Sequence, residues 1–186
     1  MNGDNFKSNF MKFLTFLFCI FFSFSYSQSF IIGDSQSFYL SQNSKFATLY
    51  KPLAKSGIGV AELIQMLKNS PVDYEAKNIF ISIGVNDDYN DRGINTLIQN
   101  LDNVFPNSYF FVIQGSFGWG NVMNINSQSK RYIDYYNTFR KAKIFVIQQS
   151  VGYGDPHSNK SEYSVISEFI DYIVYKNWKK EQAKNQ

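Results

Sequence analysis

The chain has 186 residues but only one cysteine, Cys19, and only one histidine, His157. A single thiol excludes an internal disulfide and a cysteine metal cluster. Because Cys19 lies in a segment that we expect to be removed, no thiol nucleophile would remain either. His157 is the only imidazole, so a site that needs a general base with a pKa near neutrality has one candidate.

Residues 1–27 have the pattern of a secretory signal peptide. Lys7 and Lys12 form a basic region, residues 13–24 are almost entirely apolar, and Ser25-Tyr26-Ser27 puts small residues at the cleavage site. The apolar run is shorter than the roughly 20 residues of a membrane span. We therefore expect cleavage and export to the periplasm or the extracellular space, with no stable membrane span afterwards. An uncleaved anchor is the alternative.

Charge is also sparse. Without Lys7, Lys12 and Asp4, residues 28–186 have a formal charge of +2, against +3 for the whole chain, and they contain no basic cluster. This gives no electrostatic reason to expect nucleic-acid binding. Residues 28–186 are enough for one domain with a real core, and no linker or repeat divides them. We expect a single domain and a monomer.

Short apolar runs alternate with amphipathic ones along this domain. They predict strands at 29–32, 48–54, 77–83, 109–113 and 143–147. Pro52 favours an edge position for the second run. The other four runs are continuous rather than alternating, which is typical of parallel strands covered on both faces.

Helical spacing recurs between the strands. Helices are expected around Leu63, Ile64 and Leu67, over 94–104 up to Pro106, over 130–141 with Ile133, Tyr136 and Phe139 inward, and over 165–174 before a Lys/Glu tail. The order β-β-α-β-α-β-α-β-α places no helix between the first two strands. It predicts a three-layer α/β/α sandwich around a five-stranded parallel, flavodoxin-like sheet.

Such sheets bind ligands beyond the carboxyl ends of their strands. Four motifs lie there. They are Gly33-Asp34-Ser35, Ser56-Gly57-Ile58-Gly59, Gly84-Val85-Asn86-Asp87 and Asp155-Pro156-His157. A serine becomes nucleophilic when a nearby base takes its proton, so Ser35 and His157 form a candidate pair.

The negative charge that develops on the substrate oxygen needs preorganised donors, each contributing about 3–4 kcal/mol. The backbone N–H groups of Ser35 and Gly57 and the side-chain amide of Asn86 are candidates for this oxyanion hole. Gly59 is a near alternative to Gly57.

The four motifs in this order resemble those of the SGNH (GDSL-like) hydrolase family, and the resemblance extends over residues 31–173. It implies a serine hydrolase that needs no metal or organic cofactor. It also implies that Ser35 is the nucleophile, His157 the base, and Gly57 and Asn86 oxyanion donors.

One position departs from the family pattern. The family places an aspartate three residues before its histidine, where this chain has Gly154, and Asp155 lies two residues before. Asp155 could still orient His157, a main-chain carbonyl could replace it in a Ser–His dyad, or the site could be degraded. We expect the first of these.

Two of the motifs also have a structural interpretation. Ser35 could be a helix N-cap, and Asn86-Asp87-Asp88 could be a turn that caps the next helix. The acidic residues of 87–91 lack the spacing of a calcium loop, so we expect no metal site.

Candidates for substrate contact are Asp34, Trp119 and Tyr153. Trp119 either stacks on a sugar or packs over the sheet edge. The sequence favours an exported esterase that removes acetyl-type groups from an acylated glycan or small molecule. A lysophospholipase, a thioesterase, an O-acyltransferase and a non-catalytic glycan-binding protein are the alternatives.

Overall fold

The computed structural model describes residues 28–87, 90–113, 125–147 and 160–184. The strands are β1 (Gln28–Gly33), β2 (Thr48–Ala54), β3 (Ala76–Ser82), β4 (Tyr109–Ile113) and β5 (Phe145–Ile147). The helices are α2 (Ser35–Asn43), α3 (Val60–Lys68), α4 (Asp91–Val104), α5 (Ile125–Lys141) and α6 (Lys160–Lys184). None of these helices, in the described part of the chain, is long and apolar enough to cross a membrane.

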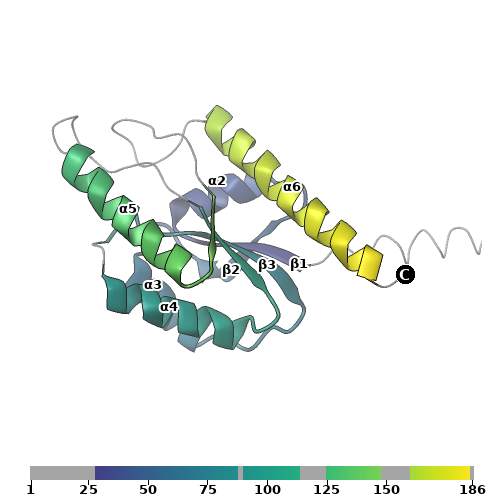
Figure 1. The fold of residues 1–186 in the computed structure, drawn as a ribbon, viewed down its shortest axis with the longest axis horizontal. Helices are drawn as coiled ribbons and strands as arrows, with labels where there is room; N and C mark the ends of the chain where they lie inside the picture. Colours follow the sequence, from purple (N-terminus) through teal and green to yellow (C-terminus); the bar gives the residue numbers. More distant parts are fainter. Residues whose placement is uncertain (1–27, 88–89, 114–124, 148–159, 185–186) are drawn as a thin grey trace, which may run out of the picture.

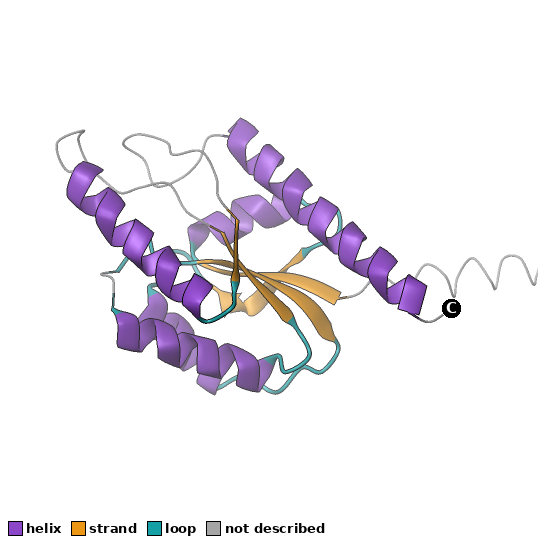
Figure 2. Cartoon of the chain, viewed as in Figure 1, coloured by secondary structure: helices purple, strands orange, loops and turns teal. Residues whose placement is uncertain are grey.

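The five strands form one parallel sheet in the order β2-β1-β3-β4-β5. Helices α2 and α6 cover one face, and α3, α4 and α5 cover the other (Figures 1 and 2). The predicted three-layer α/β/α sandwich and parallel sheet are therefore confirmed. Pro52 lies in the edge strand β2, as its missing N–H predicted.

The sheet separates two apolar cores. Leu63, Leu97 and Phe139 are fully buried in the core beneath α3, α4 and α5. Phe80 and Ile170 are fully buried in the core beneath α2 and α6. Since β1 and β3 contribute side chains to both cores, their sequences are continuously apolar rather than alternating.

Helix α2 lies between the first two strands, where the sequence pattern predicted none. Its sequence, SQSFYLSQN, is mostly polar, and two of its buried residues are Gln36 and Ser37. Apolar spacing therefore does not mark it. The signal in the sequence is the cap: Asp34 accepts a hydrogen bond from the Gln36 N–H at 3.0 Å.

The prediction for the inward face of α5 is confirmed for Tyr136 and Phe139 and wrong for Ile133. Ile133 is 52% exposed, whereas Tyr135, Tyr136 and Phe139 are buried. The tyrosines turn inward because their hydroxyls have partners there: Tyr135 donates to the Ile83 carbonyl at 3.1 Å, and Tyr136 donates to the Ile113 carbonyl at 3.2 Å. A ring with a satisfied hydroxyl packs in a core as an apolar side chain does.

A buried carboxylate fastens α6 to the start of β2. Asp171 accepts hydrogen bonds from the Ser44 hydroxyl at 2.6 Å, from the Lys45 N–H at 2.9 Å and from the Phe46 N–H at 3.1 Å. Three donors from one short loop thus meet a side chain more than a hundred residues away. The loop after α2 is fixed by this contact.

We expect Asp171→Ala to lower the free energy of unfolding by about 3 kcal/mol, because it leaves these donors without their charged acceptor. Asp171→Asn keeps one acceptor oxygen and should cost about 1 kcal/mol. Urea unfolding measures both. Glu168→Ala, an exposed change on the same helix, is the control and should change stability by less than about 0.5 kcal/mol. Equal stability of Asp171→Ala and the control would contradict the assignment.

Candidate active site

The ends of β1 and β3 meet at Gly33 and Ser82. Gly33 has φ +122°, and a Cβ added to it would lie 1.9 Å from the Ser82 carbonyl oxygen. Only glycine allows both the conformation and the approach. The Asp34 N–H then donates to that same carbonyl at 2.8 Å. The chain therefore leaves β1 in a defined direction, into α2.

Ser35 is the first residue of α2, and Asp34, not Ser35, is its N-cap. The serine therefore lies at the positive end of the helix dipole, where a developing negative charge is stabilised. Asp34 is only 1% exposed, and its carboxylate binds the Gln36 N–H. It offers almost no surface to a substrate, and the Ser82 hydroxyl also lies 3.5 Å from its Oδ1.

The loop after β2 is held against the loop after β3 by an amide. Asn86 donates from Nδ2 to the Ile58 carbonyl at 3.1 Å. A side-chain amide has two N–H donors, and this bond occupies one. The Lys55 N–H, at the start of the same loop, donates to the Gly33 carbonyl at 3.0 Å. Hydrogen bonds thus join the segments that follow β1, β2 and β3.

Gly57 and Gly59 have different reasons to be glycine. Gly57 is exposed, has φ +78°, and a Cβ there would meet nothing within 4 Å. At Gly59 a Cβ would lie 2.8 Å from the Asp87 side chain. A Cβ at Gly57 would thus enter open solvent, and the loop there is exposed, whereas Gly59 is packed against Asp87.

Asp87 fastens the same two loops a second time. Its Oδ2 accepts a hydrogen bond from the Val60 N–H, the first residue of α3, at 2.5 Å. The alternative interpretation of the acidic turn was that it caps the next helix. Asp87 instead binds the N-terminus of α3, the preceding helix, and Asn90 caps α4 through the N–H groups of Arg92 and Gly93.

Tyr135 bounds the site from α5, and the sequence did not single it out. A Cβ at Gly84, which has φ +108°, would lie 2.5 Å from its ring. An apolar hollow of about 250 Å³ lies between this ring, α3 and the start of α4, with Asp87 on its wall. The sequence signal that could have indicated a ring here is Gly84, which follows a strand and has no side chain to collide with it.

The remaining site predictions fall outside the described residues. These are His157, Asp155, Trp119 and Tyr153; Asp88 of the acidic turn also lies outside them. Of the predicted oxyanion hole, Ser35, Gly57 and Asn86 are all described, and they lie on connected loops at the carboxyl edge of the sheet. Among the residues that the structure describes, no group of His, Cys, Asp and Glu could hold a metal ion.

No family model matches the sequence, and no curated protein matches it. Solved structures match instead. A GDSL-like lipase from Bacteroides thetaiotaomicron is similar with a TM-score of 0.60 and 10% identity over 82% of this chain and 89% of that one. An extracellular lipase from Streptomyces rimosus is similar with a TM-score of 0.53 and 12% identity over 78% of this chain and 99% of that one.

A third similar structure is a carbohydrate esterase family 2 enzyme with a carbohydrate-binding domain, from Corynascus thermopiles (Myceliophthora fergusii). The TM-score is 0.56 and the identity 16% over 79% of this chain, which spans 65% of that protein. At sequence identities this low, the similarity shows that the folds are alike and no more. The chain has the fold of the SGNH (GDSL-like) hydrolases, as the order of its four sequence motifs predicted.

Proposed function

We propose that this protein is an exported serine esterase that removes short acyl groups of the acetyl type from a polysaccharide or glycan. The observation that carries the proposal is the connection between three loops: Gly33 binds Lys55, and Ile58 binds Asn86. These bonds join the segments that carry Ser35, Gly57 and Asn86 at the carboxyl edge of the sheet, where acyl transfer would need a nucleophile and oxyanion donors together.

In the proposed reaction, the Ser35 hydroxyl oxygen attacks the acyl carbonyl while His157 takes its proton. The N–H groups of Ser35 and Gly57 and the second N–H of the Asn86 amide bind the oxyanion. His157 then gives the proton to the leaving alcohol, and water releases the acyl group from Ser35 by the same steps. His157 and Asp155 follow β5, whose carboxyl end lies on the same edge of the sheet.

Two observations support a short acyl group on a carbohydrate. The apolar hollow lined by Val60, Ile64 and Tyr135 also includes Asp87, the residue after the proposed donor Asn86, and would suit a small apolar group. Two of the similar structures are family 2 carbohydrate esterases. A transferase would use the same residues and pass the acyl group to a sugar hydroxyl instead of water.

Ser35→Ala should lower kcat for p-nitrophenyl acetate at least about 1,000-fold, because the nucleophile is lost while the backbone donors remain. Stopped assays with equal amounts of purified wild type and variant measure this. Ser41→Ala, a serine on the same helix that donates to the Phe38 carbonyl, is the matched control and should retain wild-type activity.

Equal rates for wild type and Ser35→Ala would contradict the proposed serine esterase activity and favour the alternative, a non-catalytic glycan-binding protein. The choice of substrate is tested separately. Release of acetate from acetylated xylan or peptidoglycan supports a glycan esterase, whereas cleavage of lysophospholipid alone would replace it with a lysophospholipase.

Asn86→Ala should lower kcat about 100- to 1,000-fold, with little change in KM, because its amide stabilises charge only in the transition state. Asn95→Ala, an exposed asparagine on α4, is the control and should leave kcat unchanged. The variant also loses the bond to Ile58, so a modest fall in melting temperature is expected in either case. A kcat that stays low at a temperature where circular dichroism shows the variant fully folded supports the role in the oxyanion hole, and a kcat that recovers there would leave Asn86 only its role in holding the loop.

Asp155→Asn should lower kcat about 1,000- to 10,000-fold, since the imidazolium of His157 would lose the carboxylate that orients and stabilises it. The pH profile of kcat/KM provides a second readout, because the base should then titrate at lower pH. An unchanged rate and profile would indicate a Ser–His dyad in which a main-chain carbonyl orients the ring.

A further inference from the structure

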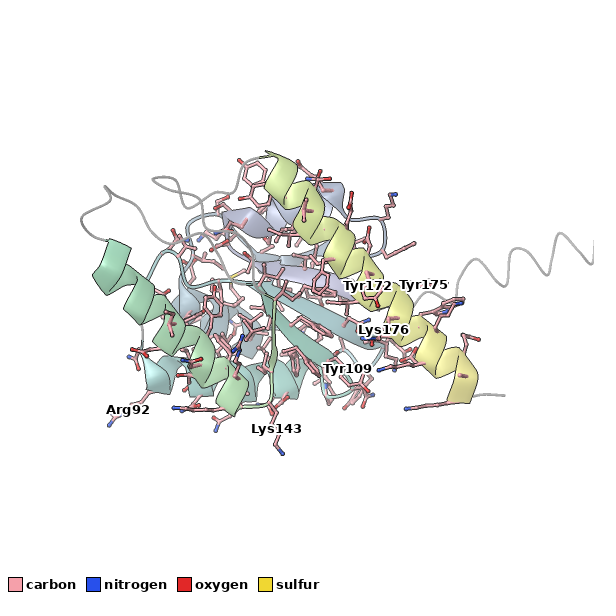
Figure 3. All side chains as sticks on the ribbon, turned by 45° about the horizontal axis from the view of Figure 1, so that its top comes forward. Arg92, Tyr109, Lys143, Tyr172, Tyr175 and Lys176 are labelled. Carbon is pink, nitrogen blue, oxygen red and sulfur yellow. The ribbon has the colours of Figure 1, made fainter. Side chains whose placement is uncertain are left out.

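A second candidate site lies at the opposite end of the sheet. A groove of about 350 Å³ runs between α6 and the first residues of β4 and β5. Tyr109 begins β4 and Phe145 begins β5, so the groove lies at the amino ends of parallel strands. The candidate active site lies at their carboxyl ends. Figure 3 shows Tyr109 beside the C-terminal half of α6, where Tyr172, Tyr175 and Lys176 project.

Aromatic rings line both walls of this groove and are unusually exposed. Tyr109 is 52% exposed and Phe145 56% exposed on the strand side, and Tyr172 is 56% exposed on the helix side. Exposed apolar patches of this kind mark binding surfaces more often than chance positions do. All three residues belong to strands or to a helix, so their exposure does not come from a loop.

The rings are held in place by other rings. Phe145 stacks on Phe111, with 5.3 Å between ring centroids, and Phe111 stacks on the buried Phe80 at 5.0 Å. On the other wall, Tyr172 stacks on Phe169 at 6.3 Å. The ring of Phe145 is therefore supported from the buried core, and a ligand that stacks on it meets a surface already in place, which lowers the entropy cost of binding.

The rim of the groove is positively charged. Lys176, Lys180 and Lys184 line it together with one acidic residue, Glu181. The Lys176 ammonium lies 5.9 Å from the centroid of the Tyr172 ring, so charge and aromatic surface are adjacent. This composition is complementary to a partner that offers both apolar faces and negative groups.

We propose that this groove binds an acidic polysaccharide, a chain of sugars that carries carboxylates. The C–H face of a sugar ring stacks on an exposed aromatic ring, its hydroxyls bind polar side chains, and its carboxylates pair with the lysines. The hollow is of the size that small ligands fill, about 300–1,000 Å³, whereas a flat bilayer would leave it empty. A second copy of the chain would bring two lysine-bearing helices together at a cost in repulsion.

This binding does not depend on hydrolysis. The groove and the candidate active site lie at opposite ends of the strands, so one chain could hold a polysaccharide at the groove while the other end acts on a neighbouring part. Polysaccharide binding at the groove and esterase activity at the candidate active site can therefore be tested, and contradicted, independently. Groove variants should hydrolyse p-nitrophenyl acetate at the wild-type rate, and Ser35→Ala should bind polysaccharide as the wild type does.

The test is affinity electrophoresis of the full chain in gels that contain polygalacturonate or, for comparison, neutral unacetylated xylan. The wild type should be retarded more by polygalacturonate, and salt should reduce the retardation. Tyr172→Ala should weaken binding about three- to tenfold through loss of stacking. Lys176→Gln should weaken it about two- to fivefold and reduce the salt dependence.

The controls lie on α5, which covers the other face of the sheet. Ile133→Ala removes an apolar side chain of similar exposure, and Lys141→Gln removes an exposed charge. Both should be retarded like the wild type. Absence of retardation, or equal retardation of Tyr172→Ala and Ile133→Ala, would overturn the proposal. So would binding to phosphatidylglycerol vesicles, or a concentration-dependent dimer, that only the groove variants lose.

Discussion

The approach of Gly33 to the Ser82 carbonyl is the constraint on which the candidate site depends. No side chain fits at Gly33, because a Cβ would lie 1.9 Å from that oxygen. With the two central strands in contact at their ends, the Asp34 N–H reaches the same carbonyl, and α2 begins at Ser35. A small displacement here would move the serine and the helix dipole together. Nothing later in the site could compensate for that movement.

Three buried or half-buried carboxylates hold helix ends and loops in place, Asp34 locally and Asp87 and Asp171 between segments distant in the chain. Asp34 caps α2, Asp87 binds the first N–H of α3, and Asp171 binds three donors from the loop after α2. Each satisfies backbone N–H groups that helix ends and loops leave without a partner in regular structure. Charge-assisted hydrogen bonds are stronger than neutral ones, so a few of them hold loops that contain little apolar surface.

The two ends of the sheet differ in the residues that lie there. Glycines and amides surround the carboxyl end, and aromatic rings and lysines surround the amino end.

Particular residues show what could be predicted and what could not. The continuous apolar runs of β1, β3 and β4 predicted a doubly covered parallel sheet, and Pro52 predicted its edge, because both patterns follow from local geometry. Helix α2 was missed because it buries polar Gln36 and Ser37 rather than an apolar stripe. Ile133 was expected on the inward face of α5 because its spacing with Tyr136 and Phe139, which are both buried, fits one side of a helix. The choice between neighbouring faces depended on which hydroxyls could reach strand carbonyls.

The sequence by itself determined the fold class and the order of the four motifs, because the period of apolar residues and the position of each motif after a strand are local properties. Only the tertiary structure decided which atoms meet: Asn86 with Ile58, Asp87 with Val60 rather than with the helix that follows it. It also decided that Gly57, not Gly59, faces open space, and that α6 leaves aromatic rings exposed beside lysines. These facts depend on contacts between residues distant in the chain, which no spacing along the chain encodes.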